Sequence, residues 1–336
     1  MLLSTTPVTL SQYLELAQNP LEAGVVFALI NNGAVFDNIP IVTKEQLSVT
    51  GVRFEGNLPA VNWAPINADP AQVSGTPKQY AEQVYIISET IDIAKWLVMD
   101  KTAITDPRGL QVSAAMKAIA YDLNDKFINN DHAAGNANSF VGIRYRINNG
   151  TLFGVRSENL IDAGGVDLSP AGMTATTANN FMVYLDQLLW SVDAPSGDPN
   201  VTIYMNDVTL RYFRKALRMM GTQGGLDTTQ DSFNRTIESY KGCPVKDIGY
   251  KADQSTRIIT TTETAAGLNG SSTFTSIYAV NASADHFGAF QMAPLNVQDL
   301  GLLNTGNLYR TLIDWAVGFY QPSIRSLARL FDVKLA

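Results

Sequence analysis

The longest helical pattern in the chain runs from residue 106 to residue 131. Its apolar residues recur at steps of three and four, which places them on one face of a helix. They are Val112, Met116, Ile119, Leu123 and Phe127. Asp106 is a suitable N-cap, and Pro107 has no N–H to leave unsatisfied at the first helical position. We expect this spine helix, about 35 Å long, to organise one domain.

Two runs of alternating apolar and polar residues flank a long loop. The runs at 46–55 and 79–90 predict two antiparallel strands. Four prolines between them, in 56–78, disfavour both helix and central-strand pairing. Val61, Trp63 and Ile66 would be exposed to water in a free loop, and a two-stranded ribbon is marginal alone. We therefore predict that this ribbon lies on a neighbouring subunit.

The rest of the first half is less regular. Residues 1–45 predict an extended arm with one short helix, and 91–99 predict a strand or a short helix. Residues 140–147, FVGIRYRI, predict a strand that ends in an Asn-Asn-Gly turn. The Gly- and Ser-rich stretch 151–175 indicates a crossing into another domain.

The second half alternates between strands and helices, which is typical of a compact α/β domain. Asn206 is the expected N-cap of one of these helices. The predicted helices are 178–192 and 207–220, the predicted strands are 199–205, 240–250, 273–280, 295–303 and 308–319, and 322–330 is a short terminal helix or turn. A flexible loop is expected at 221–225.

Charge and composition argue for subunit interfaces and against nucleic-acid and membrane binding. Only 16% of the 336 residues are charged, against about 25% in typical soluble domains, which favours large subunit interfaces. The net charge is −7 and no basic run occurs, so a sequence-reading nucleic-acid module is not expected. We expect no signal peptide, since 1–10 lack a basic region and a long apolar run, and no apolar run of membrane-spanning length occurs, so no membrane partner is expected.

The residue types that usually carry chemistry are sparse. His132 and His286 share no metal-ligand spacing, and Cys243 is the single cysteine. No set of nucleophile, base and orienting residue can be assembled from the sequence. We therefore expect no catalytic residue, no cofactor and no metal, and the chain is not predicted to be an enzyme.

The closing segment 309–333, YRTLIDWAVGFYQPSIRSLARLFDV, and the order of the elements carry a family resemblance. The chain resembles major capsid proteins of tailed bacteriophages with the Hong Kong 97-type fold. The segment 204–217, YMNDVTLRYFRKAL, resembles the strand-to-helix crossing of their inserted domain. The residues of the closing segment that carry the likeness are Trp315, Gly318, Pro322, Ser323, Arg325, Ala328, Arg329 and Leu330.

The resemblance implies an α+β fold with named parts. It makes residues 1–45 the N-terminal arm and 46–92 the E-loop, which reaches over an adjacent subunit. The P-domain combines the spine helix and the rest of 93–165 with the return segment 291–336, and 166–290 form the A-domain. Within the E-loop, the expected contacts with the neighbour are Val61, Trp63, Ile66 and Lys78.

The resemblance also implies a function. Such proteins assemble through pentamers and hexamers into an icosahedral shell, which encloses phage double-stranded DNA held non-specifically. The implied location is the virion, with assembly in the cytoplasm of the host bacterium. The implied partners are other copies of the chain, a separate scaffolding protein and a portal, and the sequence leaves a decoration protein open.

Some relatives form a Lys–Asn isopeptide crosslink between the loop and a neighbour, with a carboxylate as base. Lys78 is the only lysine in the loop, Asn304 or Asn307 could accept it, and Asp314 is the nearest acid. Composition permits this crosslink, but nothing in the sequence demands it, and we do not expect it.

Two other functions are compatible with parts of the pattern. An encapsulin-type shell that holds a cargo enzyme shares the fold, but such shells tend to begin with a helix that docks cargo, whereas residues 1–20 have the character of an arm. A soluble α/β hydrolase with a lid at 56–78 is the distant alternative, and it lacks an assignable catalytic set.

Overall fold

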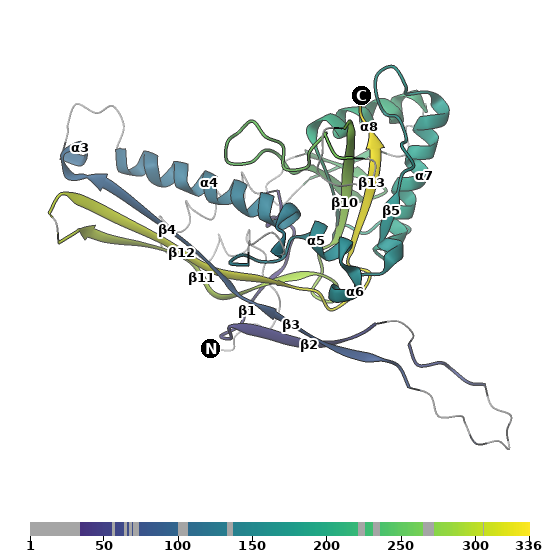
Figure 1. The fold of residues 1–336 in the computed structure, drawn as a ribbon, viewed down its shortest axis with the longest axis horizontal. Helices are drawn as coiled ribbons and strands as arrows, with labels where there is room; N and C mark the ends of the chain where they lie inside the picture. The colour runs from purple at the N-terminus through teal and green to yellow at the C-terminus, as the bar shows by residue number, and fades with distance from the viewer. Residues whose placement is uncertain are drawn as a thin grey trace.

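The computed structural model describes residues 34–55, 58–63, 66, 69, 74–99, 107–132, 137–220, 226–230, 236–264, 272–304 and 306–336. Among these residues the strands form a four-stranded, a seven-stranded and a two-stranded sheet. The first two sheets each carry helices, and the two-stranded sheet projects away from them (Figure 1). The arrangement is the α+β class expected from the sequence.

The four-stranded sheet has the order β1-β11-β12-β4. Its strands are β1 (Ile41–Thr43), β4 (Tyr85–Ala94), β11 (Gly288–Leu302) and β12 (Leu308–Tyr320). Strands β11 and β12 form a long antiparallel hairpin, with β4 antiparallel to β12 and β1 parallel to β11. The sheet therefore combines the start of the described chain with segments almost 250 residues later, such as Gln291 beside Thr43.

Helix α4 (Pro107–Asn129) runs along this sheet, as Figure 1 shows. Met116, Leu123 and Phe127 are buried on its inner face. The predicted spine helix 106–131 is therefore confirmed to within two residues at each end. Asp106, its expected N-cap, lies outside the described residues.

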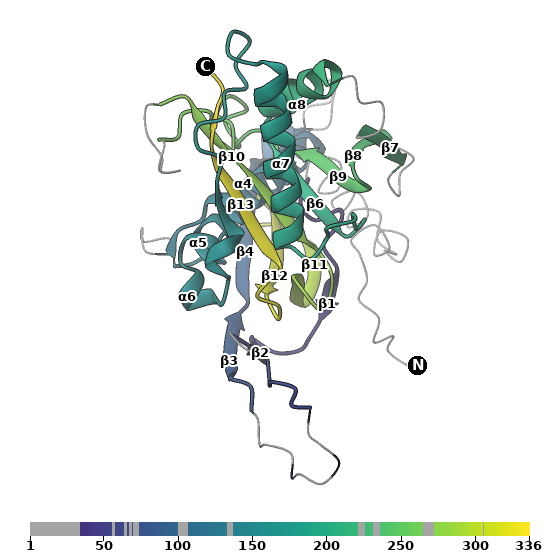
Figure 2. The ribbon, with the colours of Figure 1, turned by 90° about the vertical axis from the view of Figure 1, so that its right-hand side faces the viewer.

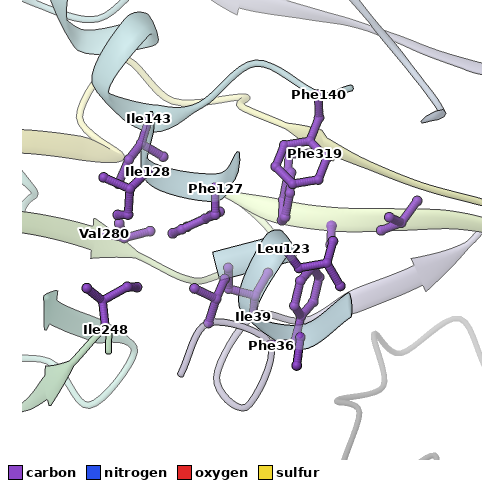
Figure 3. Close-up of a cluster of buried hydrophobic side chains, with 14 of the residues drawn as sticks. Phe36, Ile39, Leu123, Phe127, Ile128, Phe140, Ile143, Ile248, Val280 and Phe319 are labelled. Atoms are coloured by element: carbon purple, nitrogen blue, oxygen red, sulfur yellow. The ribbon is translucent and has the colours of Figure 1, made fainter. Parts of the chain in front are cut away.

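The core between α4 and the sheet is rich in aromatic rings (Figure 3). Phe319 of β12 lies 4.7 Å from Phe140 and 5.3 Å from Phe127, measured between ring centroids, and it stacks on Phe287. Phe36, from the segment before β1, packs on Phe319 as well. One strand of the sheet thus joins parts of the chain that are more than 280 residues apart.

The seven-stranded sheet has the order β5-β13-β10-β6-β9-β8-β7. Its strands are β5 (Leu160–Asp162), β6 (Val201–Met205), β7 (Leu226–Gln230), β8 (Thr236–Tyr240), β9 (Cys243–Asp247), β10 (Phe274–Asn281) and β13 (Leu327–Lys334). Helices α7 (Ala175–Ser191) and α8 (Asp207–Met219) pack on it and on each other (Figure 2). The side chain of Asn206 accepts from Thr209 N at 2.7 Å, which confirms it as the N-cap of α8.

The two-stranded sheet is formed by β2 (Ser48–Phe54) and β3 (Pro77–Gln83), which pair antiparallel from Ser48 opposite Gln83 to Phe54 opposite Pro77. These two strands and the loop residues between them are called the hairpin below. Both views show it extending away from the rest of the molecule (Figures 1 and 2). Strand β3 passes through Val84 into β4, so the predicted strand pair is confirmed, although its second run continues into another sheet.

Four short elements complete the description. Helix α3 (Lys95–Met99) follows β4 directly, α6 (Gly150–Phe153) follows α5, and a 3₁₀ turn, η2 (Ser157–Asn159), precedes β5. The strand predicted at 140–147 is wrong, because the chain there forms helix α5 (Ile143–Asn148). Ile143 and Ile147 lie four residues apart and are both buried, as one helix face requires.

The terminal helix or turn predicted at 322–330 is wrong for residues 327–330, whereas Ile324 and Arg325 do form a turn. Strand β13 occupies Leu327–Lys334 and lies between β5 and β10. Leu327, Ala328, Arg329 and Leu330 are all buried, because a strand in this position is covered on both faces.

The seven-stranded sheet therefore takes strands from both sides of 166–290: β5 before it and β13 after it. The division into domains given above stays a prediction, as do the parts named for it. Residues 1–33 of the expected arm and the expected loop at 221–225 lie outside the described residues.

Candidate intersubunit surface

The described loop residues of the hairpin do not fold back onto their own chain. Trp63 is 96% exposed and Val61 is 82% exposed, and Leu58 and Ile66 are exposed as well. Water-facing apolar side chains of this size, gathered on one projecting segment, are typical of a surface that a partner covers. The contact of this segment with a neighbouring copy stays a prediction. It requires that these side chains be open to solvent in the single subunit, as they are.

A second group of exposed apolar side chains lies at the opposite end of the molecule. Helix α3 and the turn between β11 and β12 meet there, far from the hairpin along the long axis (Figure 1). Trp96 is 74% exposed. The other members of this α3-end patch are Leu97, Met99, Leu110, Leu300 and Leu302. Sequence reasoning missed this surface, because the apolar run at 91–99 gave no sign that helix α3 would face water.

A third exposed tryptophan lies on helix α7. Trp190 is 65% exposed, and Val183 precedes it by two turns on the same face. Asp186, one turn before Trp190, is the charged residue of α7, and its side chain is half-exposed and paired with Lys241 at 2.6 Å. Three of the four tryptophans in the chain therefore face water, and Trp315 alone is buried. Exposed aromatic residues are enriched in protein interfaces.

The hairpin is seated on the body of the molecule through apolar contacts near its start. Val49 of β2 is buried against Phe290 and Tyr320, with Tyr80 and Val84 packed beside them. Next to this seat, an open groove of about 930 Å³ separates the outgoing strand from the body. Phe54, Leu58 and Ala60 form its hairpin side, and the lining residues of the body are Arg156, Asp193, Pro322, Ser323, Ile324 and Arg325.

The structure places Lys78 near the loop end of the β2–β3 pair, where it is half-exposed and engaged. Its Nζ lies 2.9 Å from a Glu55 carboxylate oxygen and 3.5 Å from the carbonyl oxygen of Thr151. A lysine held in this way is not presented to a neighbour as an unpaired amine. The expectation that Lys78 forms no crosslink therefore gains a physical reason.

The other two crosslink candidates are not brought together within one subunit. Asn307 is exposed at the β11–β12 turn, and Asp314 lies seven residues further along β12. At the rise of a strand, that separation is about 23 Å. Asp314 instead accepts a hydrogen bond from Ser88 Oγ at 2.5 Å. It is not positioned to act as a base for Asn307 of its own chain, and the same holds for Asn304, which is exposed at the same turn.

The histidines and the cysteine have structural neighbours. His132 Nε2 lies 2.5 Å from Ser139 O, and His286 Nδ1 lies 3.0 Å from Ser283 Oγ. Cys243 is buried, and its burial raises the pKa of the thiol. Among the described residues no group of three or more His, Cys, Asp or Glu side chains is arranged to hold a metal ion. In the same part of the chain, no helix is both long and apolar enough to cross a membrane.

Comparison with known proteins gave a match in structure and none in sequence. No family model and no curated protein matches the chain. The SrpI encapsulin complex of Synechococcus elongatus PCC 7942 is 14% identical, with 88% of this chain and 85% of that chain covered, at a TM-score of 0.55. The capsid of an empty GTA particle is 13% identical over 90% of each chain, at a TM-score of 0.58. A structure of Microbacterium phage Oxtober96 is 11% identical over 90% and 91%, at a TM-score of 0.53.

These structures, from an encapsulin complex, a capsid and a phage, share one architecture with this chain along nearly its whole length. The fold predicted from the order of the elements, the Hong Kong 97-type fold, is therefore confirmed.

Proposed function

We propose that the chain is the major capsid protein of a tailed bacteriophage. Copies of it assemble through pentamers and hexamers into an icosahedral shell around double-stranded DNA. The observation that carries the proposal is Trp63, which stands 96% exposed on a projecting hairpin. The shared fold of capsid and encapsulin structures supports the same role.

The two exposed apolar surfaces fit repeated association of identical copies. The hairpin and the α3-end patch lie at opposite ends of the molecule, so contact between them would be heterologous, from the head of one copy to the tail of the next. Heterologous contacts close into rings when the rotation permits, and pentamers and hexamers are such rings. Burial of one tryptophan side chain removes about 200 Å² from water and contributes about 5 kcal/mol before the losses of association.

In this proposal the chain is divided into the following parts. Residues 1–45 are the arm and 46–92 the E-loop, with Val61, Trp63 and Ile66 on the neighbour. The P-domain comprises 93–165 and 291–336, and the A-domain comprises 166–290. The net charge of −7 agrees with a lining that holds DNA without trapping it. The shell is part of the virion, is assembled in the host cytoplasm and requires a separate scaffolding protein and a portal.

The test compares the natural chain with Trp63→Ala and the conservative Trp63→Phe. We expect the natural chain to form shells that are visible by electron microscopy and large by light scattering. Trp63→Ala should shift the population to small species while the circular dichroism spectrum and thermal midpoint stay unchanged, because the side chain touches nothing in the subunit. Trp63→Phe should assemble better than the alanine variant. A natural chain that stays monomeric at every concentration would refute the proposal.

Denaturing electrophoresis of the same shells should give a single band at the mass of one chain. A ladder of covalent multimers would show that the crosslink forms after all.

An encapsulin-type shell is the second candidate, and the similarity to the SrpI encapsulin complex favours it. The contents of isolated shells separate the two candidates. Nuclease-protected double-stranded DNA supports the capsid, and a single packaged protein without nucleic acid supports the compartment. The hydrolase alternative has no observation in its favour, because the sequence offers no set of nucleophile, base and orienting residue.

A further inference from the structure

We propose that Arg146 fixes the direction in which the hairpin leaves the body and thereby sets the angle between neighbouring subunits. The inference rests on the proposed shell function, in which the hairpin reaches the next copy. Arg146 lies on α5 and acts through Glu82 of β3. It is therefore a positioning residue and does not itself touch the neighbouring subunit.

The guanidinium of Arg146 is held at all three nitrogen atoms. Its two terminal nitrogens donate to the two carboxylate oxygens of Glu82, at 2.5 and 2.9 Å. Its Nε donates to Val141 O at 3.1 Å, and Phe153 lies against it, with 5.2 Å from Cζ to the ring centroid. The residue is 1% exposed. A planar fork held at each of its three nitrogens fixes the orientation of its partner as well as the distance.

The Arg146–Glu82 pair is one polar connection, or tie, between the hairpin and the rest of the subunit. A second tie lies nearer the loop. Arg53 of β2 is buried, donates to Gln321 O at 3.4 Å and to Glu55 Oε1 at 2.6 Å, and lies over the ring of Tyr80. Glu55 in turn receives Lys78 at 2.9 Å. The strand register places Glu82 opposite Val49 and Lys78 opposite Arg53. The two ties are therefore four residues apart, about 13 Å along the hairpin.

Two ties at separate points fix the direction of the hairpin relative to the rest of the subunit. With one tie alone, the hairpin could rotate about that point. The apolar seat at Val49 does not substitute for either of them, because hydrophobic contact is not directional. Hydrogen bonds to an arginine fork weaken steeply when the angle changes. In the Arg146–Glu82 tie the arginine comes from α5, outside the hairpin, so it can set the direction of the hairpin. In the other tie the arginine, Arg53, belongs to the hairpin itself and reaches a backbone oxygen.

The length of the hairpin amplifies any change at its foot. Ile66 is twelve residues beyond Phe54, so an extended loop would carry it at most about 40 Å from the end of β2. A tilt of about 10° at the foot would then move that position by about 7 Å. A displacement of this size would place the tip on a different part of the neighbour, or rotate the neighbour to follow it.

The variants are Arg146→Lys, which keeps the charge and loses the fork, and Glu82→Gln, which keeps the shape and loses the charge. Arg214→Lys is the control, because it alters an arginine–glutamate pair of the seven-stranded unit, with Arg214 Nε 2.9 Å from Glu238 Oε2. We expect both tie variants to assemble into shells with a shifted or broader range of diameters by electron microscopy. The double variant should resemble either single one, and Arg214→Lys should give natural diameters.

A second measurement uses unassembled subunits. Spin labels at Ala60→Cys on the hairpin and Asp253→Cys on the body report the direction of the hairpin, and the buried Cys243 stays unlabelled. We expect Arg146→Lys to shift or broaden the distance distribution by several ångströms, while Arg214→Lys leaves it unchanged. Glu82→Gln supplies the same test if Arg146→Lys fails to fold.

The two measurements separate this inference from the proposed function. Natural diameters together with natural distances in both tie variants would overturn the role of Arg146, with the shell function intact. A natural chain that never assembles would remove the shell function, and the distance measurement would still decide whether Arg146 directs the hairpin.

Discussion

Gly318 of β12 lies beneath the carbonyl oxygen of Gln83, where the hairpin meets the four-stranded sheet. A Cβ atom added at Gly318 would stand 2.5 Å from that oxygen and 2.8 Å from the ring of Phe290. The oxygen belongs to the backbone at the end of β3, and Phe290 is completely buried, so neither neighbour has room to move. The absence of a side chain at this position is what allows the hairpin to approach the sheet so closely.

Gly318→Ala should therefore destabilise the subunit. Overpacking of this kind costs about 1–3 kcal/mol, and a urea titration followed by circular dichroism would show it as a lower midpoint at an unchanged slope. An unchanged midpoint would mean that β3 and β12 are further apart than the structure places them.

Lys246 and Asp37 form a buried ion pair that ties the segment before β1 to the seven-stranded sheet. Their side chains are 9% and 5% exposed, and Nζ lies 2.9 Å from Asp37 Oδ2. Asn38 joins the same site through Oδ1, 3.2 Å from Nζ. Lys246→Met should lower the free energy of unfolding by about 3–5 kcal/mol, because it leaves a buried carboxylate without its cation.

The double variant Lys246→Met with Asp37→Asn is the control. It removes both charges, so its loss should be clearly smaller than the sum of the single losses, as a double-mutant cycle in urea would measure. Additive losses would show that the two side chains do not interact.

Asp332 is a buried acid in an unfavourable environment. Its backbone has φ = 62°, and its Oδ1 has no hydrogen-bond partner among the described residues. Burial raises the pKa of its carboxyl group, and repulsion from Asp162 raises it further. Asp332→Asn should stabilise the subunit at pH 7 by on the order of 1 kcal/mol, since it removes the charge and asparagine tolerates the left-handed conformation. A calorimetric midpoint no higher than that of the natural chain would contradict this.

Glu55 makes the β2–β3 strand pair sensitive to acid. Burial by itself raises the pKa of this carboxyl group, but the hydrogen bonds from Lys78 and Arg53 outweigh burial and hold it below the usual 4.5. The folded state thus binds the proton less readily than the unfolded chain does. The stabilisation is therefore complete above pH 4.5 and is lost as the pH falls through the lowered value.

Amide hydrogen exchange of residues 48–54 and 77–83 would measure this effect. After correction for the intrinsic rates, protection of these amides should decrease below pH 4.5, and the decrease should be absent in Glu55→Gln. A decrease of equal size in the variant would assign the effect to another group.

The parts of the fold that the sequence predicted are those in which local periodicity and burial agree. Helix α4 buries Met116, Leu123 and Phe127 along one stripe, and the hairpin strands alternate because they are mostly open to solvent. Exposed loop residues such as Trp63 could be suspected of a contact from their chemistry alone. The α3-end patch could not, because its members come from three separate segments of the chain.

The wrong prediction at 140–147 and the missed strand at 327–330 share a physical cause. Each segment carries an arginine that local patterning places at the surface, and the fold buries both beside one acid. Arg144 and Arg329 each lie 3.2 Å from a carboxylate oxygen of Glu263, which is 1% exposed. Glu263 is 66 residues from one of them and 119 from the other in the sequence. No window of neighbouring residues could reveal that these charges are neutralised inside.

The distribution of the four tryptophans also gives the chain an optical property. Three indoles that face water emit at long wavelength in the free subunit, and the single buried one, Trp315, adds a constant background. Any association that covers Trp63, Trp96 or Trp190 would move the emission toward the blue without an added dye. The time course of shell formation could therefore be followed in a fluorimeter on the natural, unlabelled protein, and single tryptophan replacements would show which indole is covered.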